Sequence, residues 1–504
     1  MYVDGIRTQV PVIMGENGFV LENPVLNPSP FATQWTGAAK GINSNDWFDS
    51  GNWDNGVPGA ITDVTIPGGL TNYPTILSHY PPASCASITI GDGGSFIGAE
   101  YLTTGIATVK RTISDTRAHF LSSPVSSNTF GNVFANSISV WARWWNPLAE
   151  SWEYRTSSNM FAIGTGYNVS TTTPGVTANY TGELNCTDVT LSLSNANGGW
   201  NLLGNPYPSA IDWDEVFKDD GISGSVAAWN GTNYIYWNGT TGSLTDGIIQ
   251  AVNGFFVSTT INGSTLTIPL SARVHNPAPI LKETVPYVLK LRVNGNTASD
   301  ETFIHFNDNA TAAYDNLYDA RKLWGEDFAP QLYSMIEGDV LAINELPFDG
   351  NKTIDLGFRC NTNGEYILNA SGIESFEDST LILLEDLKNN KLQDLRNEPV
   401  YNFKYQAGDN AGRFKLHFRT QSADNDPDNS GISVYSYDHN IILTNTTGIE
   451  GKVTVYDMTG REIISTNISN QVTTSIPMPQ AVTGYYVLKI FTAKTNVIQK
   501  VFIQ

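Results

Sequence analysis

Cysteine is scarce in this chain, which has only Cys85, Cys186 and Cys360 among 504 residues. Thiols spread so widely define no disulfide framework, so we expect them to be small, buried apolar side chains. Long hydrophobic runs are lacking as well. Because a helix needs about eighteen consecutive apolar residues to cross a membrane, the sequence predicts no such span.

Basic residues and catalytic motifs are also few. Lys and Arg number 28 against 49 Asp and Glu, a net charge of −21, which argues against a nucleic-acid partner because phosphate binding needs basic patches. His-Glu-x-x-His, Cys-x-x-Cys, the P-loop and Gly-x-Ser-x-Gly are absent, and the six histidines show no metal-ligand spacing. We therefore expect no enzyme and no cofactor, with calcium as the one exception considered below.

Short alternating segments bounded by Gly, Asn and Asp fill the chain, a pattern typical of β-strands joined by turns. The clearest examples lie near the C-terminal end. Val453 and Val455 alternate with polar residues, and Asp457–Gly460 then supplies a turn with glycine where a left-handed residue is needed. Gly484–Ile490 and Val497–Ile503 form a later hairpin. These patterns predict a small antiparallel β-sandwich at the end of the chain.

This stretch, residues 432–504, resembles the type A C-terminal sorting domain of the type IX secretion system of Bacteroidetes. The motifs are Val-Tyr-Asp-Met-Thr-Gly-Arg, Gly-Tyr-Tyr-Val and a final Lys followed by alternating apolar residues. The family often opens with Asn-Pro near its first strand, where this chain has Ser436–Asn440. The positions that match the motifs are Val455, Tyr456, Asp457, Gly460, Arg461, Gly484, Tyr486 and Lys500.

The resemblance implies export of a folded cargo through the outer-membrane translocon, followed by removal of the domain by a sortase-like protease. The cargo would then be extracellular or displayed on the cell surface, associated with the outer membrane. Since such a cargo first crosses the inner membrane with a signal peptide, and the first residues lack its apolar core, we expect a mature form or a fragment. Residues 432–504 carry five basic and four acidic residues. The net negative charge of the chain therefore lies entirely in the part before residue 432.

The composition divides the chain into six predicted segments. They are 1–33, a linker or remnant of an upstream module; 34–116, a Trp-rich β module or short β-solenoid; 117–280, an aromatic-rich β-sandwich; 281–422, a β-sandwich; 423–431, an Asp-rich linker; and 432–504, the sorting domain. Residues 34–116, the first module, resemble the Trp-rich opening module of large Bacteroidetes surface proteins. Residues 117–280 and 281–422, the second and third modules, resemble modules found upstream of sorting domains, and neither resemblance brings catalytic residues with it. We expect the tryptophans of 34–116 to pack in its core.

Alternation in the third module predicts a β-sandwich. Its expected strands are 287–293, 301–306, 354–358, 365–368, 381–385, 401–405 and 413–418. Apolar residues at Ala313, Leu317, Ala320 and Trp324 follow helical spacing, so we expect one short helix over 312–324.

Aromatic residues of the second module are the candidates for ligand contacts, since exposed rings can stack on sugars or anchor protein partners. They are Trp144, Trp145, Trp152, Tyr234, Tyr236 and Trp237. Core packing is the alternative for each of them. Asn-Gly pairs flank the strand at Tyr234–Trp237 and predict a hairpin.

Two acidic clusters are compatible with either a chemical or a purely structural role. Asp212, Asp214 and Glu215 could pair as acid and base in glycoside hydrolysis, although acidic residues at this place also suit the first turn of a helix. Asp424, Asp426 and Asp428 alternate as calcium ligands do, but the glycine and distal glutamate of an EF-hand are missing. A polar linker is the alternative for this second cluster.

The sequence as a whole predicts an all-β protein of several β-sandwich-like domains in tandem. We expect an adhesin-like or structural protein of the bacterial surface, exported by the type IX system and without catalysis. The alternatives are a carbohydrate-binding accessory protein of a polysaccharide-degrading system and a hydrolase without a recognisable motif. Expected partners are the translocon, the sortase and a glycan or surface protein.

Overall fold

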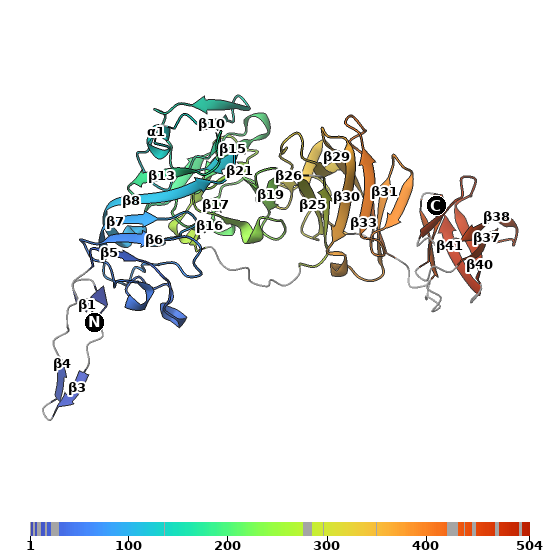
Figure 1. The fold of residues 1–504 in the computed structure, drawn as a ribbon. Helices are drawn as coiled ribbons and strands as arrows, with labels where there is room; N and C mark the ends of the chain where they lie inside the picture. The colour runs from blue at the N-terminus through green and yellow to red at the C-terminus, as the bar shows by residue number, and fades with distance from the viewer. Residues whose placement is uncertain are drawn as a thin grey trace. The chain divides into compact units, whose positions relative to one another are not determined.

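Strands dominate the structure, a computed structural model, which confirms the all-β prediction (Figure 1). It describes residues 30–135, 137–275, 285–295, 297–348, 350–420, 432–437, 439–445, 450–468, 473–492 and 496–503, with four short strands before residue 22. In these ranges the one α-helix is α1 (Phe130–Val133), and no helix is long and apolar enough to span a membrane. The chain forms two compact units, Met1–Glu283 with Asn316–Leu323, and Thr284–Asp315 with Trp324–Gln504.

The structure also contains short N-terminal strands and several 3-10 helices. Near the N-terminus, β1 (Tyr2–Val3) pairs with β2 (Ile6–Arg7), and β3 (Val12–Gly15) pairs with β4 (Gly18–Leu21). The 3-10 helices are η1 (Gly41–Asn43), η2 (Ser50–Asn52), η3 (Ala99–Tyr101), η4 (Ala196–Gly198), η5 (Trp213–Glu215), η6 (Thr245–Gly247), η7 (Leu270–Ala272) and η8 (Ile373–Ser375).

The first sheet is mostly parallel. It contains β5 (Ala32–Gln34), β6 (Asp63–Ile66), β7 (Ala83–Ile90), β8 (Leu102–Ile113) and β13 (Val176–Gly182). The first four strands pair in parallel, and β13 adds antiparallel to β8. Because β13 comes from beyond residue 116, this sheet crosses the border that we predicted between the first two modules.

The tryptophans of the first module pack in the core under this sheet, as we expected. Trp35, Trp47 and Trp53 are buried, and the ring of Trp53 lies edge-on to the other two at centroid distances of 5.1 and 4.9 Å. Such contacts stabilise a small β core because each indole buries a large apolar area. Cys85 is buried in the same core, and Cys360 is buried in the second unit. Cys186 is exposed, so our prediction of a buried thiol is wrong there.

Two antiparallel sheets build the aromatic part of the first unit. One has the order β11 (Ser151–Arg155), β10 (Val140–Asn146), β12 (Tyr167–Thr171) and β9 (His119–Leu121). The other has the order β15 (Trp200–Gly204), β21 (Gly254–Ser258), β18 (Val226–Trp229) and β19 (Tyr234–Trp237). The pairing of β18 with β19 confirms the hairpin predicted from the Asn-Gly pairs.

Two smaller sheets complete this unit. They are β14 (Val189–Ser192), β22 (Thr265–Ile268) and β17 (Phe217–Lys218), and β20 (Ile248–Ile249), β16 (Ala210–Asp212) and β23 (Arg273–Val274).

Asn316–Leu323, which we call the strap, belongs to the first unit although residues on both sides of it belong to the second. Asn316 O accepts from Gly224 N at 2.9 Å, and Leu323 N donates to the Tyr236 hydroxyl at 2.7 Å. The helix predicted over 312–324 is wrong: the segment contains turns and the short strand β26 (Ala320–Arg321). Backbone groups that a helix would pair internally are hydrogen-bonded to another part of the unit, and such tertiary bonds override local propensity.

The third predicted module is one long sheet that folds over a single core. Its strands run in the order β32 (Lys391–Asp394), β31 (Thr380–Asp386), β34 (Phe414–Thr420), β29 (Asn351–Arg359), β27 (Gln331–Ile336), β28 (Asp339–Leu346), β25 (Ser299–Phe306), β24 (Val288–Asn294), β30 (Gly364–Ser371) and β33 (Val400–Tyr405). Phe403 of β33 lies 5.1 Å from Phe358 and 5.0 Å from Phe414, between ring centroids. Strands far apart in the sheet order therefore face each other, as in a sandwich, and all seven predicted strands are present.

The C-terminal region is the small antiparallel sandwich that the sequence predicts. One sheet has β35 (Ile432–Tyr437), β36 (Asn440–Asn445) and β39 (Thr473–Pro477); the other has β38 (Glu462–Ile468), β37 (Gly451–Asp457), β40 (Gly484–Thr492) and β41 (Asn496–Ile503). Val453, Val455, Leu488 and Ile490 share the buried core, which follows from their alternation along the strands.

Candidate functional site

Three of the six candidate aromatics lie in one layer between the two aromatic sheets. The rings of Trp145, Trp152 and Tyr234 surround Phe256 at centroid distances of 5.9, 6.3 and 5.8 Å. The indole nitrogen of Trp145 donates to Trp200 O at 2.9 Å. These rings hold the sheets together, because aromatic pairs at such distances add to the stability gained by burial.

Tyr236 and Trp237 are buried elsewhere in the first unit. The indole nitrogen of Trp237 donates to the carboxylate of Asp214 at 3.0 Å, and the hydroxyl of Tyr236 accepts from the strap. With Tyr234 also buried, three of the six candidates belong to the core and have no exposed ring to stack on a ligand.

Trp144 is half-buried and borders a concave surface. Successive residues of a strand point to opposite faces, so Trp144 and Trp145 lie on different sides of β10. Trp144 lines an open depression of about 340 Å³, together with Arg155, Asn159, Met160, Thr165 and Tyr167. The guanidinium carbon of Arg155 lies 4.8 Å from the centre of the Trp144 ring, a cation–π contact.

Sequence reasoning missed two exposed aromatic residues on the other side of the same strands. Trp141 is 53% exposed and Tyr154 is 67% exposed, and their rings lie 6.2 Å apart. Counting in steps of two along residues 140–146 would have separated Trp141 and Trp145 from Trp144. It would not have shown which of them is covered by the second sheet.

The acidic cluster at residues 212–215 begins a 3-10 helix. The Asp212 carboxylate accepts from Asp214 N at 3.0 Å and caps η5, and the Asp214 carboxylate accepts from Trp237. The helix-start interpretation is confirmed, since both carboxylates have structural partners. Asp424, Asp426 and Asp428 lie outside the described residues. In the part of the chain that is described, no group of three His, Cys, Asp or Glu side chains could hold a metal ion.

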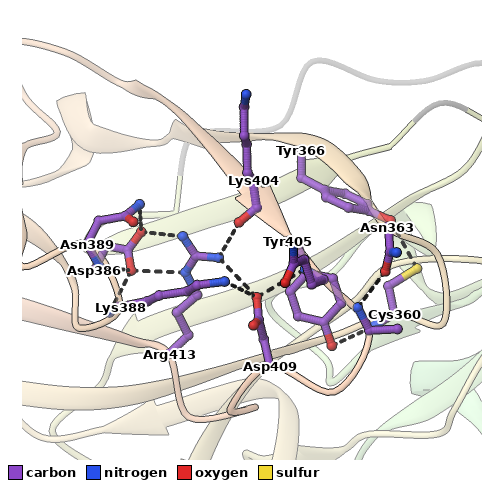
Figure 2. Close-up of polar contacts among 12 residues, drawn as sticks. Cys360, Asn363, Tyr366, Asp386, Lys388, Asn389, Lys404, Tyr405, Asp409 and Arg413 are labelled. Atoms are coloured by element: carbon purple, nitrogen blue, oxygen red, sulfur yellow. Dashed lines mark hydrogen bonds and ion pairs between the residues drawn. The ribbon is translucent and has the colours of Figure 1, made fainter.

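A buried ion pair lies in the second unit, at the end of β31 and next to the start of β34. Figure 2 shows Arg413 facing Asp386, with Nε and Nη2 donating to the two carboxylate oxygens at 2.9 and 2.6 Å. Arg413 is 1% exposed and Asp386 is 0% exposed. Lys404 O accepts from Arg413 Nη1 at 2.7 Å, and the Tyr401 hydroxyl donates to Asp386 at 2.8 Å.

The surroundings of Asp386 keep it ionised although it is buried. Burial by itself raises the pKa of this carboxyl, but the hydrogen bonds from Arg413 and Tyr401 outweigh it and lower the pKa below 3.8. Nε, Nη1 and Nη2 of Arg413 each donate a hydrogen bond inside the protein, and both side chains of the pair are closed off from solvent. Nearby, Cys360 Sγ accepts from the Tyr366 hydroxyl at 3.2 Å and is enclosed as well.

The matching positions of the C-terminal motif divide into core and turn residues. Val455 and Tyr486 are buried. Asp457 accepts hydrogen bonds at its carboxylate from Thr459 N, Thr459 Oγ1, Arg461 N and Arg461 Nε at 2.6–3.1 Å. Gly460, with φ of 84°, occupies the left-handed position of the turn. The motif therefore specifies the turn between β37 and β38.

The remaining motif positions lie near or on the surface. Tyr456 and Gly484 are half-buried, and Arg461 and Lys500 are exposed. Lys500 Nζ lies 3.8 Å from the ring centre of Tyr485, a cation–π contact on the outer face of the β40–β41 hairpin.

A family model described as "Domain of unknown function (DUF8693)" matches residues 83–237 and 223–418, which together exceed half of the chain. The chain belongs to this family. Both the Trp144 depression and the Asp386–Arg413 pair of this DUF8693 member lie inside the matched residues. The family description names no activity.

A second model, "Secretion system C-terminal sorting domain", matches residues 434–504 of the DUF8693 chain. The C-terminal sandwich is therefore a sorting domain, as its motifs predicted, and the chain is a secreted, cell-surface protein sorted by the type IX system.

One curated relative is fimbrial. Over 334 residues, the DUF8693 chain is 23% identical to "Minor fimbrium subunit Mfa5" of Porphyromonas gingivalis. The alignment covers 57% of this chain and 26% of that protein, so the chain spans about a quarter of its relative's length. Among solved structures, a β-glucuronidase from Faecalibacterium prausnitzii matches 77% of this chain and 47% of its own at 10% identity. Its TM-score of 0.12 carries no argument about fold or activity.

Proposed function

We propose that this protein is an adhesin-like or structural component of the bacterial surface and has no catalytic role. The alignment with a minor fimbrium subunit, on a chain that ends in a sorting domain, is the observation that carries the proposal. The buried Asp386–Arg413 pair and the capping role of Asp212 support it, since both clusters stabilise the fold.

The proposal includes handling by the translocon and the sortase, and association of the exported chain with the outer membrane. A net charge of −21 keeps such an exposed body soluble and disfavours non-specific contact with the anionic cell surface.

Attachment of cells tests the proposal. In a type IX-competent host, we would compare cells that carry the full chain, cells without it and cells whose chain lacks residues 434–504. Adhesion to coated surfaces and the amount of chain in sheared surface appendages should fall in both altered strains. Equal adhesion of all three strains, with no chain in the appendages, would contradict an adhesive or structural role.

Carbohydrate binding is the second candidate, because Trp144 lines an open depression with polar neighbours. Released sugar measured in the same binding assays distinguishes it from a hydrolase, since a binding protein yields no product.

A further inference from the structure

We propose that the depression around Trp144 is a binding site for a carboxylate-bearing sugar residue, of the uronic-acid class. The proposal deepens the adhesin-like function given above and rests on it. It concerns what the exported chain attaches to.

Three neighbouring strands build the floor of the site. Trp144 of β10 is opposite Tyr167 of β12 on one side and Glu153 of β11 on the other. Arg155 follows Glu153 by two residues and therefore lies on the same face of the sheet. An aromatic ring and a guanidinium are thus positioned by regular strands, which fix side chains more firmly than loops do.

The charge of Arg155 is only partly neutralised. Its Nη2 lies 3.4 Å from Glu153, which is held more closely by Asn146 at 2.6 Å. The Nε and Nη1 groups make no hydrogen bond with any described residue, and the side chain is 23% exposed. A half-buried guanidinium with free donors fits a carboxylate, since the planar fork can bind both oxygens.

Two other lining residues also offer donors without acceptors in the described part of the chain. The side-chain oxygen Oδ1 of Asn159 accepts from Thr156 N at 2.7 Å, and its side-chain nitrogen Nδ2 remains for a ligand. The indole N–H of Trp144 likewise has no protein acceptor there. A ligand that fits must therefore be rich in acceptors, and hydroxyl and carboxylate oxygens satisfy this requirement.

The apolar part of the lining indicates a ring-shaped ligand. Trp144 and the exposed Met160 provide a flat and an adaptable apolar surface, against which the C–H face of a pyranose can pack. About 340 Å³ is at the low end for ligand sites, so the depression accommodates one sugar unit of a longer chain.

Calorimetric titration of the full chain with trigalacturonate tests the site, with the neutral methyl ester and triglutamate as comparison ligands. We expect saturable binding of trigalacturonate and at least tenfold weaker binding of both comparison ligands. Arg155→Gln and Trp144→Ala should each weaken trigalacturonate binding at least tenfold, and Arg155→Lys should weaken it less. Trp141→Ala is the matched control, because it removes an exposed indole from the other face of β10, and it should change the affinity less than twofold.

Absence of saturable binding, equal binding of the neutral ester or of triglutamate, or wild-type affinity in Arg155→Gln would each overturn the proposal. Unchanged circular dichroism and melting of the variants exclude loss of fold as the cause of weaker binding. Failure here would leave the adhesin-like role standing if cells still need the chain to attach. Loss of that role would instead appear as unchanged attachment by cells without the chain.

Discussion

Asp457 explains why a short motif can specify the sorting domain. Its carboxylate accepts from two backbone and two side-chain donors in the turn after β37. Among them, the Thr459 hydroxyl contributes most to lowering the pKa of Asp457 to about 2. The carboxylate is therefore ionised at any physiological pH. Glu462, at the start of β38, is a nearby acidic residue whose side chain is exposed.

Asp457→Ala should destabilise the sorting domain and reduce the amount of exported chain, because four hydrogen-bond donors of the turn lose their acceptor. The measurement is the ratio of surface to periplasmic chain, together with proteolysis of the C-terminal region. Glu462→Ala is the control and should behave as the natural chain. Normal export of Asp457→Ala would show that the turn is not needed for sorting.

His275 makes the first unit sensitive to acid. Its ring nitrogens lie 2.8 Å from the hydroxyls of Thr75 and Ser95, and burial lowers its pKa from 6.5 to about 4. Between these values the unfolded chain binds a proton that the folded chain does not. The stability that follows is fully present above pH 6.5 and is lost as the pH falls toward 4, a loss of about 3 kcal/mol.

His275→Gln should therefore flatten the pH dependence of unfolding of the first unit between pH 4 and 6.5. Glutamine can still bond to the two hydroxyls but takes up no proton. Melting temperature against pH is the measurement, and His79→Gln, at an exposed position, is the control. A slope unchanged by His275→Gln would refute the assignment.

The buried Asp386–Arg413 ion pair joins the end of β31 to the residue before β34, and we expect it to stabilise both strands. Arg413→Met leaves the carboxylate of Asp386 without its cation, which should cost about 3–5 kcal/mol because an unpaired buried charge is strongly unfavourable. Lys388→Met breaks an ion pair with Asp409 in which the lysine is 42% exposed, and should cost less than about 1 kcal/mol.

Hydrogen exchange of residues 380–420 measures both effects, since amide protection reports the free energy of opening of this body alone. Similar protection in the two variants would show that the pair contributes no more than a surface ion pair.

Strands with one exposed face could be predicted from alternation, whereas β27 and β28, which are covered on both faces, were not predicted. β33 (Val400–Tyr405) alternates exposed and buried residues, and this alternation allowed a strand to be predicted at 401–405. In β27 and β28 most residues are buried whichever way they point, so no period of two is present. The strap was predicted as part of a helix because the spacing of its apolar residues is helical. Its hydrogen bonds go to residues about ninety positions earlier, and local spacing carries no information about such distant partners.

Of the residues that line the candidate site, the sequence predicted one and missed others. Trp144 was among the residues expected to contact a ligand. Arg155 and Asn159 were not, because their approach to Trp144 depends on the register of β10 with β11 and on the loop that follows. Trp144 and Trp145 were both taken as candidates, although their side chains lie on opposite faces of β10.

The complete chain should depend on its sorting domain for surface display. Deletion of residues 432–504 should leave the body folded and in the periplasm, since the body has its own hydrophobic cores. Cell fractionation measures the location, and fusion of these residues to an unrelated periplasmic protein should export that protein. Surface display of the truncated chain would contradict the dependence.

The strap also decides how a pulling force would travel through the protein. A chain held at its C-terminal end and loaded through its first unit carries tension from Trp324 directly into Leu323, whose backbone is bonded to Tyr236. Detachment of the strap would break its hydrogen bonds to Ile222, Gly224 and Tyr236. We expect this small step to come first under shear, before the hydrophobic core of either unit opens.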